Sequence, residues 1–133
     1  MVVVDSGVWI DFFNGAPSAA RGVLRELLVQ GEVEVCVPDL ILFEVLRGFR
    51  DEQHFRDARR LMRSFAVPPV GGEALALAAA EHYRALRASG VTIRNSIDVL
   101  IAAFCIENDF HLLHGDRDFG AFEKRRGLRV WKH

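Results

Sequence analysis

The sequence predicts an α/β fold, a three-layer α/β/α sandwich around a mainly parallel central sheet, built from a single domain over residues 1–133. Short β-branched runs alternate with longer segments whose apolar residues recur at helical spacing, and this alternation is typical of βαβ units. The first run, Val2–Val4, is apolar at every residue. Such runs are typical of strands that are buried on both faces of a parallel sheet.

The composition fits one soluble globular domain. The chain has 133 residues, 50% of them hydrophobic and 26% charged, with a formal net charge of -1. A chain this close to neutral has no overall attraction for nucleic acid, so phosphate binding requires a local basic patch. Cys36 and Cys105 lie in apolar runs and are interpreted as small core residues, which favours a reducing cytoplasm. No apolar run is long enough to span a membrane, and Met1–Val4 is too short for a signal peptide.

Start and stop signals delimit the elements of the first half of the chain. The first strand ends at Asp5, and Ser6 is placed to cap the helix that follows, which closes at Gly15. Ser18 and Gly31 begin and end a second helix. Alternating valines then predict a second strand. The expected elements are helix 8–13, helix 18–31, strand 33–37, helix 38–48 and an amphipathic helix over 51–66.

The second half continues the alternation of helices and strands. An Ala/Leu-rich helix ends at Ser89-Gly90, and Asn95 or Ser96 caps the next helix, which is strongly apolar. A short strand interrupted by two prolines is expected before the first of these helices. The expected elements are strand 67–70, helix 73–88, a helix from 95 or 96 to 106, strand 110–114, a short helix opening at 116–119 and strand 128–131.

Four carboxylates stand where a carboxylate is costly, at the ends of predicted strands or inside apolar helices. They are Asp5, Glu44, Asp98 and Asp116, and Asp118 follows closely. A buried acid loses hydration unless something compensates for it. The ligand crevice of an open parallel sheet lies beyond the carboxyl ends of the strands, so we expect the acids to converge there. Converging carboxylates repel one another, and the usual remedy is a hard divalent cation held by oxygen ligands.

Each acid also has a purely structural interpretation. Asp5 suits a turn after a strand, and Asp98 lies where the reciprocal partner of a helix cap would stand. Asp116 and Asp118 suit the start of a short helix. Glu44 has apolar neighbours on both sides, and its only local alternative is an ion pair with the arginine three residues later. The metal interpretation therefore depends on all of the acids meeting at one edge.

Four motifs resemble those of PIN-domain nucleases. The resemblance covers essentially the whole chain, and the order and spacing of the motifs are similar to the VapC subgroup, the toxin half of bacterial and archaeal toxin–antitoxin pairs. Gly7 and Gly115 depart from residues that are frequent in the family, and neither departure removes an acid. The motifs are VDSGVWI at 4–10, EVLRG at 44–48, IDVLIAA at 97–103 and LLHGDRDF at 112–119.

The resemblance implies a Mg²⁺- or Mn²⁺-dependent endoribonuclease that hydrolyses tRNA or rRNA and leaves a 5′-phosphate and a 3′-hydroxyl. It assigns catalysis to Asp5, Glu44, Asp98 and Asp116. Metal ligation is expected of Asp5, Asp98 and Asp116, with Asp118 as a supporting or second-metal ligand. Glu44 is expected to hold a water molecule or to help take its proton. Such an enzyme would inhibit translation and growth until an antitoxin blocks it.

Contacts with substrate and partners follow from the same resemblance. Ser6, Arg94 and Arg117 are expected to bind RNA, because Ser6 follows one acid and each arginine lies within a few residues of another. The arginines at 56, 59, 60 and 63 are mixed with acids along one helix and are expected to form an ordinary solvated surface. The resemblance implies a VapB-like antitoxin whose C-terminal segment lies near the acids, a homodimer, a larger complex with the antitoxin, and no membrane association.

Two other classes of protein fit part of the pattern. A catalytically inactive PIN-like module that binds RNA or protein would keep the fold, but degenerate members usually lack one or more acids, and all four are present here. A phosphatase-like or receiver-like α/β domain also places aspartates at strand ends. A receiver needs a lysine near its last strand, and neither Lys124 nor Lys132 stands at a suitable strand end.

Overall fold

The computed structural model describes residues 1–132, and residue 133, the last of the predicted single domain, lies outside the described residues. Within residues 1–132 the chain forms seven helices and four strands. In chain order they are β1 (Val2–Val4), α1 (Ser6–Asn14), α2 (Ala19–Gln30), β2 (Val35–Cys36), α3 (Asp39–Leu46), α4 (Glu52–Met62), α5 (Glu73–Ala88), α6 (Ser96–Asn108), β3 (His111–Leu113), α7 (Phe119–Arg126) and β4 (Arg129–Val130).

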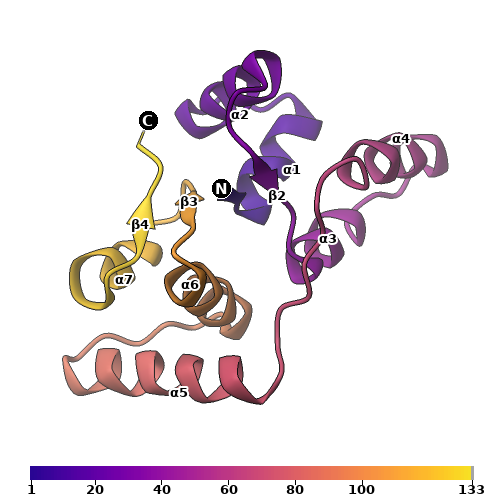
Figure 1. The fold of residues 1–133 in the computed structure, drawn as a ribbon. Helices are drawn as coiled ribbons and strands as arrows, with labels where there is room; N and C mark the ends of the chain where they lie inside the picture. Colours follow the sequence, from indigo (N-terminus) through magenta and orange to yellow (C-terminus); the bar gives the residue numbers. More distant parts are fainter. Residues whose placement is uncertain (133) are drawn as a thin grey trace.

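The four strands form one entirely parallel sheet in the order β2-β1-β3-β4. Helices α5, α6 and α7 pack together on one side of it, and α1, α2, α3 and α4 form a second group on the other side (Figure 1). The predicted three-layer α/β/α architecture is therefore confirmed. No helix within residues 1–132 is long and apolar enough to cross a membrane.

The central strand β1 lies in the middle of the hydrophobic core. Val2, Val3 and Val4 are at most 1% exposed, as expected for a strand covered on both faces. Trp9 of α1 is completely buried and packs against Phe13 and Phe65. Because β1 is clamped between β2 and β3, the residues that follow its last valine are held in a defined place.

The predicted strand at 67–70 is wrong, because these residues form a loop. Only Ala66, just before them, bridges the sheet, and its carbonyl accepts a hydrogen bond from Val37 N–H at 2.9 Å. Pro68 and Pro69 have no N–H group to give to a ladder. The loop is instead held by Asp39, whose carboxylate accepts a hydrogen bond from Val70 N–H at 2.9 Å.

Ser18 caps α2, and its hydroxyl oxygen accepts a hydrogen bond from Arg21 N–H at 3.0 Å. This bond satisfies one of the N–H groups that the first turn of a helix leaves unpaired. We expect Ser18→Ala to lower the free energy of unfolding by about 1 kcal/mol, measured by urea denaturation. Ser89→Ala is the control, because the exposed Ser89 hydroxyl donates only to a carbonyl of its own helix. An equal loss in the control would contradict the capping role.

Candidate functional site

A cleft of about 490 Å³ opens beyond the carboxyl ends of β1 and β3. Its walls come from α1, from the start of α2, from the start of α6 and from the loop after β3. The position agrees with the expected crevice at the edge of a parallel sheet. Its polar lining residues are Asp5, Ser6, Asp11, Ser18, Asn95, Asp98 and Asp116.

Asp5 joins the end of β1 to the first turn of α1. Its N–H donates to Leu113 O at 2.9 Å, which ties the ends of β1 and β3 together. Asp5, and not Ser6 as the sequence suggested, stands at the cap position of α1, but its side chain makes no capping hydrogen bond. The side chain is buried, and its Oδ1 has no hydrogen-bond partner among residues 1–132. If Asp5 served only as a turn residue, one of its two carboxylate oxygens would therefore be buried without a hydrogen-bond partner among residues 1–132.

The surroundings of Asp5 disfavour its charged form. Burial raises the pKa of this carboxyl from 3.8 to about 6, and the charges of Glu44 and Asp116 add to the shift. The backbone N–H groups of Ser6 and Gly7 oppose it. A cation beside Asp5 would supply the compensation that the folded chain lacks.

Glu44 points inward from α3. The residue is 7% exposed, and its Oε1 has no hydrogen-bond partner among residues 1–132. The local ion pair with Arg47 is not formed, because the Arg47 guanidinium lies 5.4 Å from the centroid of the exposed Phe43 ring. Glu44 contributes to the raised pKa of both Asp5 and Asp98, which places it in the same cluster.

Asp98 lies in the first turn of α6 and is 7% exposed. Asn95 caps this helix through its side chain, which accepts a hydrogen bond from Ile97 N–H at 2.9 Å. The reciprocal bond from Asn95 N–H to the Asp98 carboxylate is absent within residues 1–132, so the capping-box interpretation is not borne out. Burial raises the pKa of Asp98 to about 7, with further contributions from the charges of Asp5, Asp116, Glu44 and Asp118.

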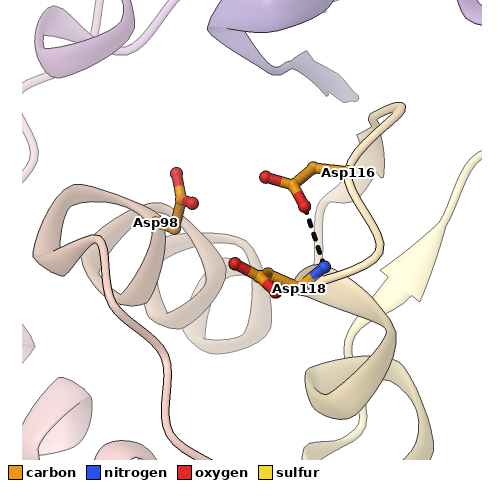
Figure 2. A group of neighbouring side chains, drawn as sticks. All are labelled: Asp98, Asp116 and Asp118. Carbon is orange, nitrogen blue, oxygen red and sulfur yellow. Dashed lines mark hydrogen bonds between the residues drawn. The ribbon is translucent and has the colours of Figure 1, made fainter.

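Asp116 and Asp118 complete the cluster from the loop between β3 and α7. One carboxylate oxygen from each of Asp98, Asp116 and Asp118 lies within 4.8 Å of the others, and Figure 2 shows these side chains around a common space. Asp116 Oδ1 also accepts a hydrogen bond from Asp118 N–H at 2.9 Å, which fixes the turn. Asp118 occupies the cap position of α7 without a capping bond.

The donor set fits a hard divalent cation. All the groups that converge are carboxylates, and the side-chain oxygens of Asp5 and Glu44 include buried atoms with no partner in residues 1–132. Mg²⁺ takes oxygen ligands in octahedral geometry and keeps several waters, so two or three carboxylates per ion suffice. The same residues without a cation would concentrate negative charge in a partly buried site, as the raised pKa values of Asp5 and Asp98 indicate.

The three predicted substrate contacts do not all lie in the cleft. Ser6 lines the cleft beside Asp5. Arg94 and Arg117 are exposed and are not part of the cleft wall. Asp11 and Asn95 line the cleft but were not predicted as site residues. Asp11 could have been recognised from the sequence, because it is an acid inside the apolar helix that follows Asp5.

The fold and the cleft define a class of α/β domains that carry a multi-carboxylate site at the edge of a parallel sheet. A family model described as PIN domain matches residues 2–125. The chain belongs to the PIN-domain family. It is 30% identical over 130 residues to VapC ribonuclease Mb1587 of Mycobacterium bovis and, equally, to ribonuclease VapC11 of Mycobacterium tuberculosis, and each alignment covers 98% of this chain and 97% of the relative. The chain is thus similar over its length to VapC ribonucleases.

Solved structures with a similar fold include toxin–antitoxin complexes. VapBC2 from Rickettsia felis, bound to promoter DNA, has a TM-score of 0.76 at 16% identity and covers 99% of this chain and 100% of its own. FitAcB from Neisseria gonorrhoeae has a TM-score of 0.73 at 17% identity, covering 99% and 97%. VapC20 of Mycobacterium tuberculosis, described as a sarcin–ricin loop cleaving toxin, has a TM-score of 0.68 at 19% identity, covering 91% and 94%. At these identities the likeness shows the fold alone.

Proposed function

We propose that this protein is the toxin of a VapBC-type pair and acts as a Mg²⁺- or Mn²⁺-dependent endoribonuclease. The observation that carries the proposal is a cluster of five carboxylates, in which Asp5, Asp98 and Asp116 line one cleft and the charges of Glu44 and Asp118 act on Asp98. The relationship to proteins named VapC ribonuclease supports the choice of RNA as substrate. The solved complexes with a similar fold support an antitoxin as partner.

Asp98, Asp116 and Asp118 would hold the ion, with Asp5 completing the ligand set. When bound, a divalent ion acidifies a water molecule and offsets charge on the phosphate. Glu44, which is buried with its Oε1 unpartnered among residues 1–132, orients the attacking water and accepts its proton. Ser6 donates a hydrogen bond to a phosphate oxygen, while Arg94 and Arg117 remain predicted contacts for flanking phosphates. Hydrolysis breaks the bond between phosphorus and the 3′ oxygen, which takes up a proton.

The direct test is RNA cleavage with controlled metal. We expect the purified protein to cut tRNA or rRNA in Mg²⁺ or Mn²⁺, to stop when EDTA is in excess, and to resume when the ion is restored. Sequencing of the new 5′ ends identifies the RNA that is cut. Cleavage that continues in excess EDTA would exclude the metal mechanism. Tight RNA binding without any cleavage would instead favour the inactive binding module.

The proposed partners require exposed surface. Trp9 is fully buried, so the apolar part of α1 that is available to a partner consists of Ile10 and Phe13, which line a groove with Val45 and Phe49 of the α3 region. An antitoxin segment of amphipathic character suits this groove. We also expect a homodimer in the cytoplasm, visible as elution at about twice the monomer mass. Monomeric behaviour at micromolar concentration would count against the dimer.

A further inference from the structure

The exposed side of α4 and the residues just after it form a hollow lined by arginines. Its volume is about 410 Å³, and its lining consists of Arg56, Arg59, Arg60, Arg63 and Ser64. The arginines are spaced i, i+3, i+4 and i+7, which places them on one face of the helix. We call these four residues the arginine face. The opposite side of the helix buries Ala58 and Met62 against the core, so the direction of the arginine face is set by packing.

The arginine face has little internal charge compensation. Arg56 lies 3.4 Å from Glu52, but both side chains are more than half exposed, and such pairs contribute little. Arg59, Arg60 and Arg63 have no carboxylate within ion-pair distance among residues 1–132. The negative end of the helix dipole offsets part of the charge in the last turn. The arginines are exposed, as the sequence suggested, and the hollow between them is lined by four arginines and one serine without an acid.

The side chains that line the hollow indicate which class of ligand it would bind. No apolar side chain lines the hollow, so it has no anchor pocket of the kind that protein segments require. Arginine guanidinium groups present forked donors that match phosphate oxygens. From residue 56 to residue 63 the helix rises about 10 Å, which spans about three successive phosphates of one strand of a duplex. A polyanion with regularly spaced phosphates fits these features better than a peptide.

A basic surface outside the cleft would help the protein to hold a polyanionic substrate. A cluster of five carboxylates lies in and around the cleft of a chain of net charge -1, so the approach of a polyanion to the cleft is not favoured by the protein as a whole. We propose that the arginine face is a second RNA-binding surface, separate from the lining of the acidic cleft, which holds the phosphate backbone of the substrate. This inference rests on the proposed function for the identity of the polyanion.

The test measures binding without cleavage. A fluorescein-labelled RNA hairpin is titrated with the full-length protein in EDTA at several KCl concentrations, and Kd is read from fluorescence anisotropy. We expect the triple variant Arg59→Gln, Arg60→Gln, Arg63→Gln to bind more weakly. The slope of log Kd against log salt should fall by about 2, since each lost phosphate contact removes about 0.7 to 0.9 from it.

The matched control is Arg25→Gln, Arg84→Gln, Arg87→Gln, which removes the same charge from three exposed arginines of α2 and α5. We expect it to keep the salt slope of the parent protein. A second variant, Arg59→Lys, Arg60→Lys, Arg63→Lys, keeps the charge and should keep most of the slope, which separates lost contacts from lost folding. Thermal unfolding of every variant verifies the fold.

Several outcomes would overturn the inference. An unchanged slope in the Gln variant of the arginine face, or an equal decrease in the control, would show that these arginines make no specific phosphate contact. Loss of antitoxin binding with RNA binding intact would assign the surface to a protein partner. Because the assay contains EDTA, its result is independent of catalysis. A protein that fails to cut RNA in Mg²⁺ but shows the expected slope would contradict the proposed nuclease and support the RNA-binding surface.

Discussion

Asp98→Asn is expected to reduce the rate of RNA cleavage more than about a hundredfold. Changes to residues that merely support metal ligands cost about 10- to 100-fold, and Asp98 is a proposed ligand itself. It is also the acid whose raised pKa reflects the charges of all four others, which places it at the electrostatic centre of the cluster. Asparagine keeps the size of the side chain and removes its charge. The measurement is the initial rate on labelled RNA at saturating Mg²⁺, with Mn²⁺ affinity from calorimetry as an independent readout.

Asp11→Asn is the matched control for this prediction. Asp11 lines the same cleft, but its charge does not contribute to the pKa shifts of Asp5 or Asp98. We therefore expect its cleavage rate and Mn²⁺ affinity to stay within about threefold of the parent values, well below the effect expected for a ligand. If Asp98→Asn kept more than a tenth of the activity, or if both variants lost activity equally, the assignment of the metal site would be wrong.

The metal-free protein is expected to lose stability as the pH rises from about 4 to about 7. The pKa of Asp5 is raised from 3.8 to about 6 and that of Asp98 to about 7, with burial as the main cause. The folded state therefore binds protons more tightly than the unfolded state. The stabilisation from these two groups is complete below pH 3.8 and is lost as the pH passes through 6 and 7. Urea denaturation in EDTA across this range measures the effect.

Divalent ions should reverse this loss. Binding to the folded state at about 100 times Kd adds about 2.7 kcal/mol, which corresponds to a rise in Tm of about 10 °C for a domain of this size. The rise should be large at pH 8 and small at pH 5, because protons compete for the ligand carboxylates. Asp98→Asn removes one buried charge, so this variant should be more stable than the parent protein in EDTA at pH 8 and respond less to Mg²⁺. A Tm response independent of pH would contradict the coupling of metal and carboxylates.

Local signals were sufficient for most helices. Helix α5 begins and ends where the sequence predicted, because Gly72 precedes it and Ser89-Gly90 follows it. Gly31 adopts the left-handed conformation that ends α2, with φ of 66°. The edge strands β2 and β4 are shorter than predicted. The loop at 67–70 was missed because it depends on a hydrogen bond from Val70 N–H to the carboxylate of Asp39, which lies thirty-one residues away in the chain.

The acids show what the local sequence can identify and what requires the tertiary structure. The apolar neighbours of Glu44 and Asp98 identify costly carboxylates from local sequence alone, because such a residue has no solvated face. Their meeting in one cluster depends on the parallel register of β1 with β3, where Val4 pairs with Leu113, and on the packing of α3 and α6. The sequence by itself determined the fold class, the identity of the acids and the family.

Only the tertiary structure decided which structural alternatives fail. The capping box of Asp98 and the ion pair of Glu44 with Arg47 are allowed by spacing, yet neither forms within residues 1–132, and packing instead buries both carboxylates in one cluster. The tertiary structure was also needed to identify the arginine face. Spacing predicted which residues share a helix face, but the absence of acidic partners around Arg59, Arg60 and Arg63 among residues 1–132 depends on distances between elements, and those distances are set by the packing of the whole domain.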